Sequence, residues 1–337
     1  MFTNHLTEFA GLPVVNYLNL PGEEVREWSG EPDLDPGTLA DPGAVAWGLS
    51  HYYDEMGDPR SARRYLTGFV ESVSDPAAVT AVVIGSLVEA FEVESSDEVR
   101  DLLVELAPRL PGLRSLFYAD LVVEECEASW IRHGNLSPLV AAFPGLTGFA
   151  VRGTSHLSME ALEHDGLRGL TLQGGGLPRK LARQVVGARL PSLEHLELWL
   201  GVEDYGGDTA PEDLGPVLSG EAFPKLRTLG LRNTENLRSW FPVLAEAPVL
   251  SSLEVLDLSL GDLSDEGARA LIDLAPAFRG LKRLDLHHHY LSEDMCERVR
   301  AALPGVEVDL SDVREPEIDG DEDDEDREVY YYTAVAE

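Results

Sequence analysis

The residues best suited to chemistry are a run of three histidines, His287–His289, and three aspartates at comparable positions, Asp257, Asp285 and Asp309. The imidazole of His287 with several carboxylates is a ligand set that zinc or iron accepts in proteins. Consecutive residues of a strand point to opposite faces, however, so the three histidines cannot all reach one ion. A metal-dependent enzyme centred on Asp257, Asp285, His287 and Asp309 is therefore the alternative hypothesis and not the first one.

Other catalytic signatures are absent from the sequence. It contains no phosphate-binding loop that ends in Gly-Lys-Ser/Thr, no Gly-x-Ser-x-Gly elbow and no His-Glu-x-x-His pair. The run Gly174–Gly176 is followed by Leu177 and Pro178, without the later glycine and acid that a dinucleotide site needs. We therefore expect no catalytic residues, no cofactor and no enzymatic activity.

The elements that must position these residues follow from a recurring phrase: an apolar residue, two of any type, an apolar residue, one of any type, and an apolar residue. Its clearest copies are Leu193-x-x-Leu196-x-Leu198, Leu226-x-x-Leu229-x-Leu231, Leu253-x-x-Leu256-x-Leu258 and Leu281-x-x-Leu284-x-Leu286. The central residues of all the copies are Val82, Leu116, Phe149, Leu170, Leu196, Leu229, Leu256, Leu284 and Val308. Each copy predicts a strand, which indicates about nine strands.

Between the copies the apolar spacing changes to that of a helix. Ser264 and Ser292 each precede acidic residues, so both are expected to cap a helix whose N-terminus attracts negative charge. Proline stops such as Leu303-Pro304-Gly305 then end the helices.

A strand, a turn, a full helix and a stop resemble the ribonuclease-inhibitor-like class of leucine-rich repeats, over about residues 76–312. The resemblance implies an α/β fold, a curved solenoid with a parallel concave sheet of about nine strands and outer helices. In that class the position of His289 usually holds an Asn that bonds loop backbone.

Two segments lie outside the repeats. Residues 1–75 are expected to form an N-terminal cap, with a strand within residues 44–53, a loop over 30–43 and an amphipathic helix over 61–73. Residues 313–337 form an acidic tail whose run 319–328 is expected to be disordered. The final segment 329–335 has strand propensity, and we favour its docking on the last repeat because an exposed aromatic strand promotes aggregation.

The concave face should carry the residues that alternate with the apolar positions of each strand. The side chains of its N-terminal half are mostly small, whereas those of its C-terminal half are charged. We therefore expect the partner-binding residues in the C-terminal half. They are His195, Glu197, Trp199, Arg232, Asp257, Arg283, Asp285, His287 and Asp309.

Stacked strands lie about 4.8 Å apart, so Asp257, Asp285 and Asp309 should form a ladder of like charges. Arg232 and Arg283 lie in adjoining columns and can neutralise part of it. A solvated ladder is the favoured interpretation, and a site for a partner's Lys or Arg is the other.

Trp199 and Arg232 are residue types that often contribute most to interfaces. The alternative for Trp199 is that the long loop 201–220 covers it, and the sequence leaves the two possibilities open.

The formal net charge is −35, and the two cysteines, Cys126 and Cys296, match no metal or disulfide pattern. An acidic surface repels nucleic-acid phosphates and anionic lipid, so neither nucleic acid nor membrane is an expected partner. The charge suits solubility first and a basic protein or peptide second; a mimic of nucleic acid that blocks a basic protein is a further alternative. No secretory signal or membrane-spanning run is evident, and we expect a cytoplasmic protein.

The stretches Leu196–Gly201, Leu256–Gly261 and Leu284–His289 resemble a poorly characterised family of bacterial cytoplasmic leucine-rich-repeat proteins. Members of that family tend to be encoded beside modifying enzymes of the radical-SAM and ATP-grasp types. The resemblance implies an adaptor or scaffold that recruits a substrate or a modifying enzyme. It supplies no catalytic residue, and the partner's identity and the oligomeric state stay open.

Overall fold

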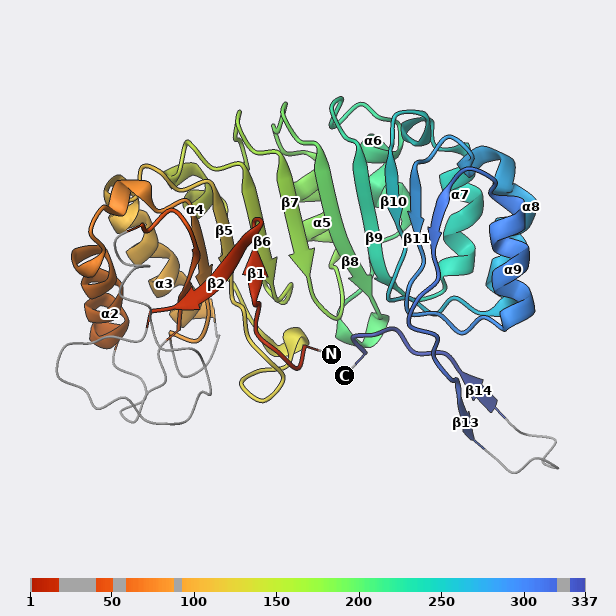
Figure 1. Cartoon of the computed structure of the whole chain (residues 1–337), viewed down its shortest axis with the longest axis horizontal. Helices are drawn as coiled ribbons and strands as arrows, with labels where there is room; N and C mark the ends of the chain where they lie inside the picture. The colour runs from red at the N-terminus through yellow and green to blue at the C-terminus, as the bar shows by residue number, and fades with distance from the viewer. Residues whose placement is uncertain (1, 18–40, 51–58, 88–92, 320–327, 337) are drawn as a thin grey trace. The chain divides into compact units, whose positions relative to one another are not determined.

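The computed structural model describes residues 2–17, 41–50, 59–87, 93–319 and 328–336. They form two compact units. The N-terminal unit comprises residues 2–172 with 188–192, and the C-terminal unit is made mainly of residues 173–187 and 193–337. In both units parallel strands alternate with helices, as the repeated phrase predicts (Figure 1).

In the N-terminal unit the strands follow one another across the sheet in chain order. β1 is antiparallel to β2, whereas β2 to β6 pair in parallel. The register places Val82 beside Leu116 and Leu116 beside Phe149, and all three are buried. The strands are β1 (Glu8–Phe9), β2 (Leu12–Asn16), β3 (Ala46–Leu49), β4 (Ala81–Ile84), β5 (Ser115–Tyr118), β6 (Gly148–Arg152) and β7 (Gly169–Gln173). The helices are α2 (Pro59–Ser72), α3 (Val93–Leu106) and α4 (Ser137–Ala142), with 3-10 turns at Pro76–Ala78, Ala107–Arg109 and Ala128–Trp130.

In the C-terminal unit β8 to β12 pair in parallel. One continuous row of partners, Leu196, Leu229, Leu256, Leu284 and Val308, joins the central residues of five phrases. The four leucines are fully buried, and each contributes roughly 1.5–3 kcal/mol of hydrophobic stabilisation. The strands are β8 (His195–Gly201), β9 (Thr228–Thr234), β10 (Val255–Asp257), β11 (Arg283–Asp285) and β12 (Glu307–Asp309).

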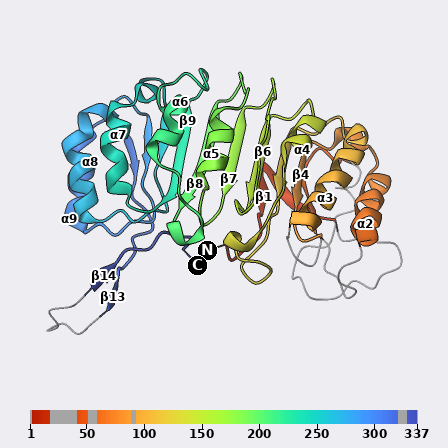
Figure 2. The same cartoon turned by 180° about the vertical axis from the view of Figure 1, so that it is seen from behind.

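Helices cover the rear of this sheet, as the view from behind shows (Figure 2). They are α5 (Arg179–Val186), α6 (Gly215–Leu218), α7 (Trp240–Glu246), α8 (Asp265–Phe278) and α9 (Glu293–Ala302), with 3-10 turns at Glu203–Tyr205, Pro211–Leu214, Leu237–Ser239 and Pro248–Ser251. Ser292 caps α9 by accepting a hydrogen bond from the backbone N–H of Met295. Ser264 occupies the same position before α8 without a side-chain cap bond. Among the described residues, no helix is long and apolar enough to cross a membrane.

The parallel sheet begins before the first of the nine copies counted in the sequence analysis, the one around Val82. β3 lies within the strand expected over residues 44–53, α2 matches the helix expected over 61–73, and β2 adds a further strand. β2 and β3 also fit the phrase, as Leu12-x-x-Val15-x-Tyr17 and Ala44-x-x-Trp47-x-Leu49, which the count of about nine strands did not include. The register places Val15 beside Trp47 and Trp47 beside Val82. A boundary between cap and repeats at residue 75 remains a prediction. Most of the loop expected over 30–43 lies outside the described residues.

The face of the N-terminal unit is not an open surface of small side chains, as the sequence suggested. Val83, Phe117 and Ala150 form a buried apolar cluster on it, and Leu6, Phe9 and Val14 pack against that cluster. The rings of Phe9 and Phe117 meet edge to face with centroids 5.8 Å apart. The N-terminal segment therefore covers this part of the wall (Figure 1). The repeat pattern gives no information on what covers a sheet face.

A buried ion pair lies close to this segment. The Arg152 guanidinium is 3.1 Å from the Asp120 carboxylate. The same guanidinium lies over the ring of Phe2, 3.7 Å from the ring centroid. His5 also contacts Asp120, and the backbone N–H of Leu6 donates to it. Burial lowers the pKa of Arg152 to about 10, while the hydrogen bond to Asp120 raises the pKa of His5.

The end of the C-terminal segment docks on the C-terminal unit, at β9 and after β10 and not on the last repeat as we expected, while Val329 to Tyr332 stay exposed. The Asn233 side chain clamps the backbone of Val335 with two hydrogen bonds of 2.9 Å, one to the carbonyl and one from the N–H. The N–H of Ala334 donates to the carbonyl of Leu260, and Val335 is 1% exposed. β14 (Glu328–Tyr330), which includes the first residues of this segment, forms an antiparallel hairpin with β13 (Glu317–Asp319). Residues 320–327, most of the run expected to be disordered, lie outside the described residues.

We expect Asn233→Gly to release the C-terminal segment. Glycine tolerates the left-handed backbone at this position, where φ is 53°, so the variant removes the clamp without adding backbone strain. Two lost hydrogen bonds of about 1 kcal/mol each should speed amide exchange at Ala334 and Val335 roughly tenfold or more. Hydrogen exchange measured by NMR gives these rates, and unchanged protection at both amides would show that the clamp does not hold the segment.

We also expect Arg152→Met to destabilise the protein, because it leaves the Asp120 carboxylate buried without its guanidinium partner. Breaking a buried pair in this way costs about 3–5 kcal/mol, whereas Arg152→Met with Asp120→Asn should lose less. Urea unfolding of both variants measures the difference. Equal losses in the single and double variants would contradict the pairing.

Candidate binding face of the C-terminal unit

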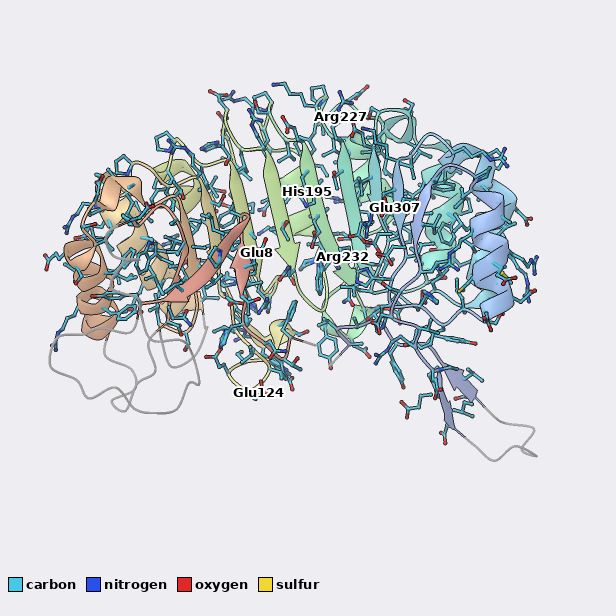
Figure 3. All side chains as sticks on the ribbon, in the orientation of Figure 1. Glu8, Glu124, His195, Arg227, Arg232 and Glu307 are labelled. Atoms are coloured by element: carbon cyan, nitrogen blue, oxygen red, sulfur yellow. The ribbon has the colours of Figure 1, made fainter. Side chains whose placement is uncertain are left out.

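The predicted carboxylates of Glu197, Asp257, Asp285 and Asp309 lie on one row because the strands β8 to β12 pair in register. Glu197 on β8 is beside Gly230 on β9, and Gly230 is beside Asp257 on β10. Asp257 is then beside Asp285, and Asp285 beside Asp309. The side chains labelled in Figure 3 include His195 on β8, Arg232 on β9 and Glu307 on β12. We call the whole set the polar wall: His195, Glu197, Trp199, Arg232, Asp257, Arg283, Asp285, His287, Glu307 and Asp309.

Glu197 is the centre of the first network on the polar wall. Its carboxylate accepts hydrogen bonds from the indole N–H of Trp199 at 2.7 Å and from Arg232 at 3.1 Å, and His195 is 3.6 Å away. Burial alone would raise its pKa, but the hydrogen bond with His195 and the charge of Arg232 lower it to about 2. Glu197 is therefore ionised at any physiological pH.

Arg232 joins this network to the next carboxylate of the row. Its Nε lies 3.4 Å from Asp257 and donates to the hydroxyl of Ser259 at 2.9 Å. Gly230 stands between Glu197 and Asp257, and a Cβ there would come within 3.1 Å of the Glu197 side chain. The absence of a side chain at Gly230 leaves Arg232 able to bridge the carboxylates on either side.

Trp199 does not present its indole for contact with a partner, because it is only 4% exposed. Its ring lies 5.1 Å from the Arg232 guanidinium in a cation–π contact, and its N–H is bound to Glu197. The hydrogen bonds of the following loop go elsewhere, from Val202 to Gly175 and from Thr209 to Leu177. Of the two possibilities that the sequence left open, this burial favours a covered Trp199, and a part for Trp199 in binding stays a prediction. The alternation of side chains along β8 predicts on which face of the sheet Trp199 lies, but it does not predict whether other residues cover the ring.

Arg283 is the centre of the second network. Its guanidinium donates to Asp285 at 2.9 Å, to Asp309 at 2.7 Å and to Glu307 at 3.1 Å. On the other side of Asp285, the imidazole Nδ1 of His287 lies 2.7 Å from the carboxylate. Burial alone would raise the pKa of Asp285, but the hydrogen bonds from His287 and Arg283 hold it well below its usual range. The same hydrogen bond raises the pKa of His287.

The recurring aspartate has a structural role at each strand end. Asp257 accepts the backbone N–H of Ser259 at 3.0 Å, Asp285 that of His287 at 3.1 Å, and Asp309 that of Ser311 at 3.0 Å. A carboxylate that bonds the N–H two residues on stabilises a turn. These bonds explain why the repeats carry Asp here. The carboxylates are also partly buried and paired with arginines, and do not form the freely solvated ladder that we favoured.

One neighbouring pair of carboxylates has no shared cation. Arg232 pairs with Asp257 and Arg283 with Asp285, yet no ion pair found among the described residues joins both acids. Burial raises the pKa of Asp257, Arg232 opposes this, and the neighbouring charge of Asp285 adds to it. The polar wall carries five carboxylates, those of Glu197, Asp257, Asp285, Glu307 and Asp309, against the two guanidinium groups of Arg232 and Arg283. Negative charge is therefore in excess at this face.

The alternative metal centre is not assembled. Its four residues, Asp257, Asp285, His287 and Asp309, are all described, and Arg283 occupies the space between two of the carboxylates. In the described part of the chain, no group of three or more His, Cys, Asp or Glu side chains is arranged to hold an ion. A row of carboxylates along a sheet spaces its members by strand separation and does not converge them on a point.

The other two histidines of the run have structural partners. The Nε2 atom of His289 lies 3.1 Å from the carbonyl oxygen of Leu310. Its Nδ1 atom accepts a hydrogen bond of 3.1 Å from the N–H of Leu291. This is the backbone-bonding role expected from its place in the repeat. His288 lies on a left-handed backbone and contacts Asp312 at 3.3 Å.

Comparison with known proteins finds similar chains among the solved structures. No model of a known protein family matches the chain, and no curated protein does. A Bacteroides fragilis protein, whose crystal structure comes from a structural genomics consortium, has 32% sequence identity to this chain and a TM-score of 0.69. The match covers 74% of this chain and 70% of the Bacteroides fragilis chain. An internalin of Listeria monocytogenes aligns at 15% identity with a TM-score of 0.34, over 82% of this chain and 63% of its own. At 32% identity over more than two thirds of both chains, the protein belongs to the same family as the Bacteroides fragilis protein.

Proposed function

We propose that this protein is a non-catalytic scaffold that binds a protein or peptide through the polar wall, and that the partner contributes a Lys or Arg side chain. The observation that carries the proposal is the pair Asp257 and Asp285, neighbours in register that no Arg or Lys among the described residues bridges, although His287 contacts Asp285. An incoming cation would stabilise both ionised carboxylates at once. Arg fits the site better than Lys because its planar guanidinium donates to two carboxylates simultaneously.

The rest of the polar wall supports a selective site. Glu197, Arg232 and Arg283 are held by several bonds each, so their side chains are already ordered before a partner arrives. Little side-chain entropy is then lost on binding, which favours affinity. Trp199 acts from beneath by orienting Glu197 and Arg232, a positioning role in place of a direct contact.

The wider assignment extends the family resemblance of the sequence. The full helices α8 and α9 between successive strands support the ribonuclease-inhibitor-like class, and an adaptor that recruits a substrate or a modifying enzyme in the cytoplasm fits a binding wall without catalytic residues. The competing assignment is an acidic mimic that blocks a basic nucleic-acid-binding protein. It needs only diffuse charge, so its binding should weaken steeply with salt.

Neutralising the central pair should abolish recognition of a cationic peptide. Asp257→Asn with Asp285→Asn retains the side-chain oxygen that each turn needs and removes both charges. We expect a fluorescent peptide alternating Arg and Gly to bind at least about tenfold more weakly, as measured by anisotropy at physiological salt.

The matched control is Asp273→Asn with Glu297→Gln, which removes two exposed carboxylates from α8 and α9. It should bind the peptide as the unmodified protein does. If both double variants weaken binding equally, diffuse charge rather than the polar wall recognises the peptide, and the mimic is the better account.

Binding should also depend on pH through His287. Because its pKa is raised in the folded protein, His287 carries a positive charge below that pKa and competes with a cationic peptide for Asp285. Affinity should therefore increase as the pH rises through the folded pKa of His287, and peptide binding should lower that pKa. An NMR titration of the His287 ring with and without peptide measures both effects, and His287→Gln should bind independently of pH over this range. An affinity that falls as His287 loses its proton would contradict this arrangement.

A further inference from the structure

Exposed apolar side chains are concentrated near the C-terminus. Of the seven large hydrophobic side chains that are exposed among the described residues, six lie between residues 313 and 332; the other is Trp130. The six are Val313, Ile318, Val329, Tyr330, Tyr331 and Tyr332. All six residues of β13 and β14 are themselves exposed. Figure 1 shows this hairpin projecting away from the strands of the C-terminal unit.

Both ends of the hairpin are nevertheless fixed to the body of the unit. On the entering side, the N–H of Arg314 donates to the carbonyl of His289 at 2.7 Å. On the leaving side, the N–H and carbonyl of Tyr332 both bond the hydroxyl of Tyr290, at 3.0 Å and 2.6 Å. The clamp between Asn233 and Val335 follows. Ordering the two segments that flank the hairpin costs chain entropy, yet it buries none of the residues of β13 and β14.

The hairpin is also too small to be stable for its own sake. It has three residue pairs, Glu317 with Tyr330, Ile318 with Val329, and Asp319 with Glu328. An isolated two-stranded sheet is marginal in water, and each of its outer edges offers unpaired backbone groups. A third strand would satisfy one edge and cover apolar side chains that are now exposed.

The charge around the hairpin determines which strand it can accept. Residues 312–337 hold twelve acidic and two basic residues. A second copy of this chain would bring the same excess, and its net charge of −35 opposes such a contact. A strand that alternates basic and apolar residues is complementary to both the charge and the exposed side chains. The rings of Tyr330 and Tyr332, stacked with centroids 6.1 Å apart, offer their faces to cationic groups.

We propose that the β13–β14 hairpin is a second docking site, which pairs edge to edge with a basic β-strand of a partner protein. Backbone hydrogen bonds along the free edge supply the main attachment, and the alternate side chains supply selectivity. The site does not depend on the polar wall. It explains why a short exposed hairpin is anchored at both ends, since the anchors present its edge in an ordered state.

Three peptides of equal charge test the pairing. The first alternates Lys and Val, the second alternates Lys and Gly, and the third is the Lys–Val peptide with N-methyl groups on alternate amides, which block strand pairing. We expect the first to bind the full chain about tenfold more tightly than either of the others, by fluorescence anisotropy at physiological salt. The measurement is repeated in the Asp257→Asn and Asp285→Asn background, where tight binding of the first peptide should persist.

Variants of the hairpin locate the site. Ile318→Ser with Val329→Ser should remove the preference for the Lys–Val peptide without altering the thermal midpoint, because both side chains are exposed. Trp130→Ser, which removes the exposed hydrophobic residue outside the tail, should leave the preference unchanged. Equal binding of the three peptides, or a preference that survives in the hairpin variant, would overturn the proposal. A concentration-dependent dimer that the hairpin variant abolishes would show a second copy as the occupant and would overturn it as well.

Discussion

The constraint on which this structure depends is parallel pairing in register. It places equal positions of successive repeats side by side, so Leu196, Leu229, Leu256 and Leu284 form one buried row. The same constraint places Asp257 beside Asp285 and Asp285 beside Asp309, about one strand spacing apart. A position that suits the core thus repeats favourably, whereas a charged position repeats at an electrostatic cost that other residues must offset.

The C-terminal unit offsets that cost unevenly. Gly230 replaces a carboxylate in the row, which lets Arg232 bridge Glu197 and Asp257, and Arg283 bridges Asp285 and Asp309. In the described part of the chain, no arginine bridges Asp257 and Asp285. Because the aspartates also hold the turns at the strand ends, their presence has a structural cause. The cation site that we propose would use the negative charge that Arg232 and Arg283 do not balance.

Much of the fold could be predicted from the repeated phrase, because apolar spacing directly reports which side of a strand is buried. It located β4 to β12 and brought Glu197, Arg232, Asp257, Arg283, Asp285 and His287 to one face. It could not predict the burial of Trp199 or the covering of Val83, Phe117 and Ala150 by the N-terminal segment, since periodicity within a strand is independent of what packs on top of it. The pairing of Arg232 and Arg283 with particular acids likewise depends on side-chain reach across strands.

The most direct test of the account is the pKa of the Asp257 carboxyl group, followed by carbon-detected NMR in the free protein and in the presence of an Arg-containing peptide. An unbridged, partly buried carboxylate beside Asp285 should have a raised pKa when free, and a bound guanidinium should lower it. A free-state pKa that is not raised, together with no change when the peptide binds, would contradict the claim that this pair forms the cation site.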